Sequence, residues 1–183
     1  MTGWATRSAN IATAIKDIAI GGSPWLPWDR RYGLDRLDES TLTTMLGATV
    51  PGAQVVGLRR DIDRLTTDRA RLTLEWNDAG TAAALPTAAF AKGTPSLAAS
   101  RVLNSAFGLC ANEVHFYNRA AGDLTDITLH PYFAEVGSGG RFLLVLESLT
   151  STADDGDDVH FYTLDEEASL EHAEAIMDAL AIL

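Results

Sequence analysis

A change in hydrophobic period along the chain is the feature that most constrains its fold. Before Pro51, apolar residues recur at helical spacing. After it they alternate with polar residues, as in a strand with one buried face. The clearest alternation sets Leu72, Leu74 and Trp76 against Arg71, Thr73 and Glu75.

The N-terminal part predicts two helices joined by an irregular arm. Residues 8–20 carry isoleucines at helical spacing, with Lys16 on the polar, solvated side. Residues 23–32 contain prolines and aromatic side chains, which predicts an irregular arm packed against the protein. Asp38 caps a short helix that ends at Gly47.

The middle of the chain predicts a sheet with one helix inserted. The helix carries one apolar face that includes Leu103, Phe107, Cys110 and Val114. An interruption of the helix near Gly108 is the alternative. The last strand is almost entirely apolar, as a strand buried on both faces would be. Strands are expected over 53–58, 70–76, 85–92, 132–136 and 141–147, and the helix over 100–121. This order favours an α+β fold in which a helix packs on a five-stranded antiparallel sheet.

The C-terminal part turns polar and acidic after Ser148. A last helix then carries an apolar stripe up to Leu183 without a glycine or a basic last turn, so we expect the natural chain to continue. We divide the chain into an N-terminal helical extension (1–48), a sheet-and-helix lobe (49–149), and a linker with the first helix of an incomplete further lobe (150–183).

Composition excludes several classes of function. The 183 residues are 46% hydrophobic, and the single cysteine excludes a disulfide framework. A formal charge of −11 disfavours nucleic acid and anionic membranes as partners, although a local basic site for a small phosphate ligand is compatible with it. With no membrane-length apolar run and no signal peptide, we expect a cytoplasmic protein.

Two residues suggest chemistry. Lys92 is one of only two lysines and ends the third predicted strand. Glu113 lies three residues after Cys110 and four before Tyr117, so it borders the apolar helix face and points toward the sheet. A strand lysine paired with a helix glutamate holds the α- and β-phosphates of ATP in the kinase fold. The main chain after the last strand would then form a hinge that binds adenine.

The chain resembles the N-terminal lobe of the kinase-like small-molecule phosphotransferases, which include aminoglycoside phosphotransferases, choline kinases and ecdysteroid kinase-like proteins. The resemblance covers about residues 40–183, and the Asn-Glu-x-x-Phe-Tyr pattern is fairly specific for the ecdysteroid kinase-like branch. The matching segments are Leu85-Pro-Thr-Ala-Ala-Phe-Ala-Lys92, Asn112-Glu-Val-His-Phe-Tyr117 and Leu144-Val-Leu-Glu-Ser-Leu149.

The resemblance implies transfer of the ATP γ-phosphoryl to a hydroxyl of a small molecule. Lys92 would contact the phosphates, Glu113 would orient Lys92, and the main chain of Glu147, Ser148 and Leu149 would bind adenine. The catalytic residues and the Mg²⁺ ligands would lie in a C-terminal lobe that this chain lacks, so the chain alone should be inactive.

One segment departs from the family. The phosphate loop should fall in residues 60–69, which contain no glycine, so Arg or Thr side chains would have to replace its backbone contacts. This favours an alternative, a non-catalytic nucleotide-binding or protein-interaction module. An unrelated α+β protein is the third hypothesis. A truncated lobe should also self-associate through an exposed apolar face.

The remaining candidates have ordinary explanations. Cys110 lies on the apolar helix face and is expected to pack in the core. The acidic run 154–158 lacks the register of a calcium loop, and no serine has the setting of a hydrolase nucleophile. The four histidines show no metal-binding spacing; they are His115, His130, His160 and His172.

Overall fold

The computed structural model describes residues 4–20, 32–64, 67–124 and 128–148, and single residues between 169 and 177. The helical elements are α1 (Trp4–Ile20), η2 (Leu34–Arg36), α2 (Glu39–Leu46), α3 (Asp78–Ala82), α4 (Ala98–Phe107), α5 (Leu109–Arg119), η3 (Ala121–Asp123) and η4 (Ser138–Gly140). The strands are β1 (Val55–Arg64), β2 (Asp68–Trp76), β3 (Ala88–Gly93), β4 (Pro131–Val136) and β5 (Phe142–Glu147). Leu149, the arm over 23–31 and the acidic run lie outside the described residues.

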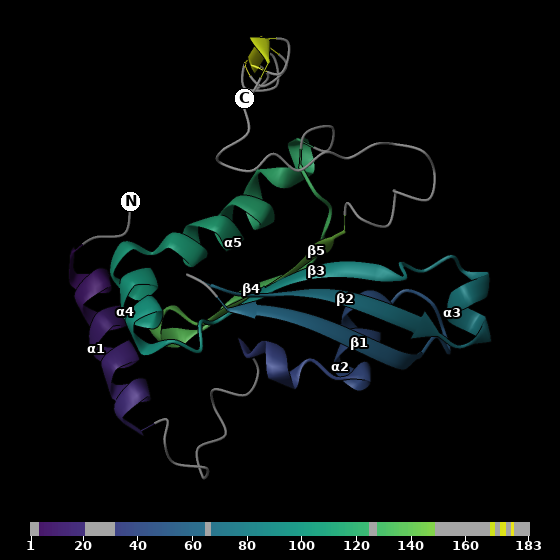
Figure 1. Cartoon of the computed structure of the whole chain (residues 1–183), viewed down its shortest axis with the longest axis horizontal. Helices are drawn as coiled ribbons and strands as arrows, with labels where there is room; N and C mark the ends of the chain where they lie inside the picture. Colours follow the sequence, from purple (N-terminus) through teal and green to yellow (C-terminus); the bar gives the residue numbers. More distant parts are fainter. Residues whose placement is uncertain are drawn as a thin grey trace.

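The strands form one antiparallel sheet in the order β1-β2-β3-β5-β4. Helices α4 and α5 connect β3 to β4, and the hairpin from β4 returns β5 to the middle of the sheet, beside β3. This confirms the predicted α+β class and the five-stranded antiparallel sheet. Figure 1 shows α5 on one side of the sheet and α2 on the other, with α1 and α4 side by side at one end.

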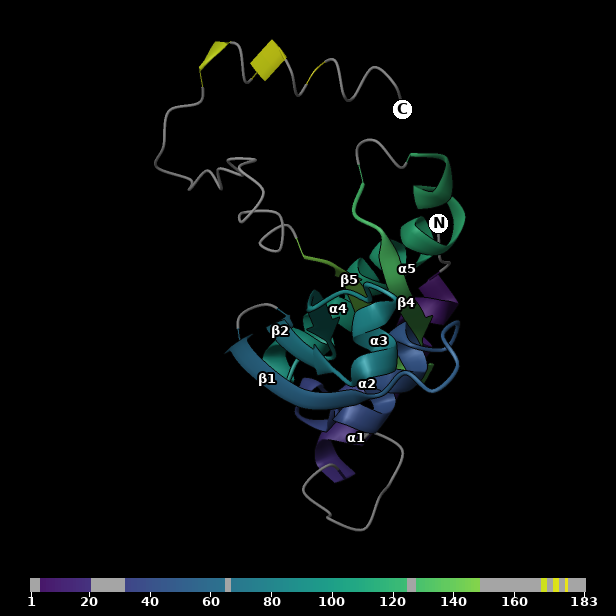
Figure 2. The same ribbon diagram turned by 90° about the vertical axis from the view of Figure 1, so that its right-hand side faces the viewer.

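Two hydrophobic cores lie on opposite faces of the sheet. The first joins η2 and α2 to the inner residues of β2 and β3, including Leu42, Leu72 and Ala91. The second joins α5 to β5 and β4, with Cys110 and Val114 in it. In Figure 2 the sheet is seen from another side, with α2 and α5 still separated by it.

Strand β5 belongs to both cores. Leu143 and Val145 face the first core, whereas Phe142, Leu144 and Leu146 face the second. All five are at most 2% exposed, which confirms the prediction of a strand buried on both faces.

The two predicted N-terminal helices are present, and α1 differs from the prediction in its start and in the residue that it buries. The Asp38 side chain accepts a 2.8 Å hydrogen bond from the Thr41 amide, as expected of a cap. Hydrogen bonding to the Thr41 side chain, and then to its amide, lowers the pKa of Asp38. Helix α1 begins at Trp4, four residues earlier than predicted. Lys16 is exposed as expected, but Ile15 is 53% exposed, because α1 buries Ala14 instead.

The β1–β2 hairpin is longer than predicted. β1 continues to Arg64 and pairs with β2 residue by residue, ending with Arg64 opposite Asp68. Most of the segment in which we expected a phosphate loop, residues 60–69, is therefore paired strand. The sequence of this segment does not alternate between apolar and polar residues as a strand usually does. The outer face of the hairpin is charged, and its inner face carries Arg60, which donates to main-chain carbonyls around η2.

The expected helix over 100–121 is two helices. Gly108 adopts φ +65°, a conformation that favours glycine, and ends α4 before α5 begins. The expected single apolar face is wrong for α4, since Leu103 and Phe107 are 43% and 55% exposed. Asn104 and Ser105 are buried instead, and the Ser105 hydroxyl donates to the carbonyl of Gly139 at 3.1 Å.

The expected strands over 70–76 and 85–92 are joined by the short helix α3, which Asn77 caps by accepting from the Gly80 amide. Among the described residues, no helix combines the length and the apolar character that a membrane crossing needs.

We expect replacement of Phe142 by Ala to lower the free energy of unfolding by about 3–5 kcal/mol, because it leaves a cavity at a side chain with no exposed surface. Phe107→Ala is the matched control, since Phe107 is largely exposed, and it should cost less than about 1 kcal/mol. Urea denaturation measures both. Equal losses would contradict the assignment of β5 as the shared centre of the two cores.

Candidate functional site

Lys92 lies at the end of β3, on the sheet face that α5 partly covers. Its neighbours in β3, Ala91 and Gly93, are buried and face the other way. Lys92 is placed opposite Leu144 of β5 on one side and Arg69 of β2 on the other. The lysine therefore stands at the boundary between the second core and the uncovered half of the same face.

The structure brings Lys92 and Glu113 together. The Lys92 Nζ donates to Glu113 Oε1 at 2.5 Å, with side chains 26% and 30% exposed. Glu113 comes from α5, which is held on the sheet by Cys110 and Val114, one turn before it and one residue after it. Because the pair is anchored by a strand and a packed helix, the ammonium group is held at the edge of the core and stays partly exposed.

The uncovered part of this face is a charged surface on β1, β2 and β3, which we call the open half-face. Cross-strand pairing arranges it in rows: Asp63, Arg69 and Lys92 form one, and Asp61, Arg71 and Phe90 form the next. A third row consists of Arg59, Thr73 and Ala88. All residues of the first two rows except Lys92 line a hollow of about 340 Å³.

The open half-face is basic in an acidic protein. Its three rows contain four basic residues and two acidic ones, whereas the whole chain has a formal charge of −11. Within it, Arg69 Nη2 lies 2.6 Å from Asp63 Oδ2. The arrangement suits an anionic ligand, since arginine and lysine side chains are the usual partners of phosphate oxygens.

Cys110 lies behind the ion pair. It is 3% exposed, and its thiol donates to Asn104 Oδ1 at 2.9 Å. Burial raises the pKa of Cys110 to about 12; the charge of Glu113 also raises it, while Lys92 opposes the shift. Cys110 is thus a protonated core residue, as the sequence predicted.

The residues expected to bind adenine are only partly described. The Glu147 amide donates to the carbonyl of His130 at 2.9 Å, so this N–H is engaged within the protein. Ser148 is buried, and Leu149 lies outside the described residues. Glu147 stands opposite Ala89, three residues before Lys92 in β3, so a ligand reaching from Lys92 to this end of β5 would span roughly 10 Å.

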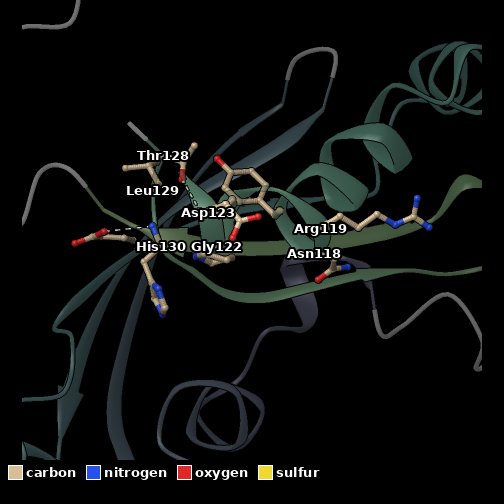
Figure 3. Close-up of a pocket in the computed structure, with 11 residues that line it drawn as sticks. Asn118, Arg119, Gly122, Asp123, Thr128, Leu129 and His130 are labelled. Atoms are coloured by element: carbon tan, nitrogen blue, oxygen red, sulfur yellow. Dashed lines mark hydrogen bonds between the residues drawn. The ribbon is translucent and has the colours of Figure 1, made fainter. Parts of the chain in front are cut away.

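A second hollow, of about 360 Å³, lies at the far end of α5 (Figure 3). Asp123 and Gly122 lie near the middle of the labelled group, whereas Arg119 extends away from it. The Glu147 carboxylate borders this hollow and accepts from the His130 amide at 3.3 Å. Its lining mixes opposite charges with main chain and defines no class of ligand.

The described residues do not form a metal centre. No group of three or more His, Cys, Asp or Glu side chains in them is placed to hold a metal ion. His115 and His130 are exposed, and His130 makes an edge-to-face contact with Tyr132; the other two histidines lie outside the described part.

Comparison of the chain with protein-family models, curated proteins and solved structures finds no match. The class of protein defined by fold and site is therefore an α+β protein with an open antiparallel sheet, a lysine–glutamate pair and a basic half-face.

Sequence reasoning considered Arg or Thr side chains of residues 60–69 as phosphate contacts, but it missed Arg59, Arg71 and the aspartates of the open half-face. The signal was present, because Arg69 and Arg71 alternate with the apolar residues of β2 and so share one face. The sequence alone does not give the strand register that places these residues in rows with Lys92. That register depends on the β1–β2 hairpin continuing to Arg64.

We expect the Lys92–Glu113 pair to be coupled by about 0.5–1 kcal/mol, because both side chains are about three-quarters covered. A double-mutant cycle with Lys92→Met and Glu113→Gln, followed by urea denaturation, measures it. The control cycle uses Arg64 and Asp35, 3.0 Å apart with 48% and 63% exposed side chains, where the coupling should be smaller. A coupling no larger than in the control would show that packing does not hold the Lys92–Glu113 pair.

We expect the Cys110 thiol to be unreactive toward a disulfide reagent at pH 8 in the folded protein. Folding raises its pKa, so the reactive thiolate is nearly absent until far more alkaline pH. In denaturant the thiol should react fully at pH 8, and absorbance at 412 nm measures both states. Rapid reaction of the folded protein would place the thiol at the surface.

Proposed function

We propose that this chain is the nucleotide-binding lobe of a kinase-like small-molecule phosphotransferase, with Lys92 binding the phosphates of ATP. The observation that carries the proposal is the Lys92–Glu113 ion pair, formed between the third strand and the helix that follows. It joins the two residues that the family resemblance assigns to phosphate binding.

The sheet supports the same proposal. A lysine ending the third strand and a glutamate on the helix that follows, ahead of two further strands, are the arrangement that the resemblance implies. The ligand would lie along the open half-face, with its phosphates at the row of Lys92 and its base toward the end of β5. In this orientation Phe90 lies between the two ends, where its ring offers apolar contact to the sugar or base.

The chemistry assigned to these residues is binding. Lys92 would neutralise phosphate charge, and Glu113 would fix the direction of the ammonium group. Mg²⁺, the general base and the contacts to the hydroxyl acceptor would come from a C-terminal lobe, so this chain alone should not transfer a phosphoryl group.

A second function is favoured by one observation, the pairing of the β1–β2 hairpin up to Arg64 and Asp68. A paired, glycine-free hairpin cannot fold its main chain around phosphates as a glycine-rich loop does. The alternative is therefore a module that binds a nucleotide, or a protein, without catalysis. Self-association through an exposed apolar face also stays a prediction. Exposed apolar side chains in and beside α4 include Leu97, Leu103 and Phe107.

We expect Lys92→Ala to reduce ATP affinity at least tenfold, because it removes the charge nearest to the proposed phosphate position. Isothermal titration calorimetry measures the affinity. Lys16→Ala is the matched control: it removes the chain's other lysine, which is exposed on α1, and should bind like the wild type. The proposal fails if ATP does not bind, or if both variants bind it equally well.

A further inference from the structure

Four charges form a line across the open half-face. In the order Asp63, Arg69, Lys92, Glu113, they come from β1, β2, β3 and α5. The outer contacts are short, 2.6 Å from Arg69 to Asp63 and 2.5 Å from Lys92 to Glu113. The signs along the line are therefore negative, positive, positive and negative.

The two cations in the middle are directly opposite each other in the sheet. Like charges in facing positions of neighbouring strands destabilise a sheet, and each cation here is offset only by a partner on its outer side. An anion placed between Arg69 and Lys92 would interact favourably with both. This juxtaposition points to an anionic ligand at this row.

The contact between Asp63 and Arg69 is open to solvent. The Asp63 side chain is 60% exposed, and Arg69 is the partner that the described part of the chain gives its carboxylate. The Arg69 side chain is 36% exposed, so a ligand oxygen can reach it. A phosphate and the Asp63 carboxylate would compete for the same guanidinium group, because the planar guanidinium group of arginine donates two hydrogen bonds to either of them.

We infer that Arg69 binds the terminal phosphates of the nucleotide together with Lys92, and that Asp63 is a built-in competitor that occupies Arg69 when no ligand is bound. The inference rests on the proposed nucleotide-binding function and names the residues that replace the glycine-rich loop. The site would thus contact phosphate oxygens through side chains, and a phosphate bound to Arg69 would displace the Asp63 carboxylate while Glu113 stays paired with Lys92.

The test is calorimetric binding of inorganic tripolyphosphate, ATP and adenosine, with EDTA present, to the wild type and variants. Arg69→Ala should weaken ATP and tripolyphosphate about tenfold, the loss typical of a charge-assisted contact, and leave adenosine unchanged. Asp63→Asn should strengthen both phosphate ligands about two- to fivefold, because it removes a competitor worth no more than a surface ion pair.

Matched controls come from the opposite face of the same hairpin. Arg64 and Asp35 form an ion pair of similar kind away from Lys92, so Arg64→Ala and Asp35→Asn should bind as the wild type does. Circular dichroism of each variant verifies that it is folded, and Arg69→Lys, which retains the charge, should recover part of the lost affinity.

The outcomes separate this inference from the proposed function. If Lys92→Ala abolishes ATP binding while Arg69→Ala and Asp63→Asn bind as the wild type does, the inference is overturned and the proposed function stands. If Asp63→Asn weakens binding, Asp63 contacts the ligand and is not its competitor, which also overturns the inference. If the wild type binds neither ATP nor tripolyphosphate, the proposed function itself fails.

Discussion

The burial of β5 on both faces is the constraint on which the rest of the structure depends. Leu143 and Val145 complete the core under α2, and Phe142, Leu144 and Leu146 complete the core under α5. Burial of both faces requires structure on each side of the sheet around β5, and β5 lies in the interior of the sheet, between β3 and β4. The same strand flanks Lys92, so the position of the candidate site follows from the packing of β5.

The break at Gly108 divides the connection between β3 and β4 into two helices with different packing partners. α4 buries Asn104 and Ser105, whose side chains donate to the carbonyls of Ser100 and Gly139, and it packs beside α1. α5 starts in a new direction and lays Cys110 and Val114 on the sheet, which brings Glu113 to Lys92. An unbroken helix would have kept Leu103 and Phe107 in line with Cys110, at the cost of changing the direction in which Glu113 points.

Sequence patterns predicted the elements that carry strong periodicity. The alternation of Leu72 and Leu74, the apolar run of β5 and the cap at Asp38 each have a local physical cause, and each is present in the structure. The Lys92–Glu113 contact was also within reach, because helix periodicity placed Glu113 at the edge of the buried face. Two features depend on tertiary structure: the exposure of Leu103, set by a single φ angle at Gly108, and the strand pairing of residues 60–64, whose charged pattern resembles that of a loop.

The charge distribution explains why a basic site can exist in an acidic chain. Charges separated by more than a Debye length are screened from one another, so the overall negative charge has little effect on contacts within a few ångströms. What matters locally is that β1 and β2 place Arg59, Arg69 and Arg71 on the same face as Lys92, while Asp61 and Asp63 neutralise only part of that charge. The surrounding negative surface repels polyanions with long contact surfaces, such as nucleic acids. The hollow itself is lined by two arginines and two aspartates, so the positive balance of the three rows comes from Arg59 and Lys92, which do not line it.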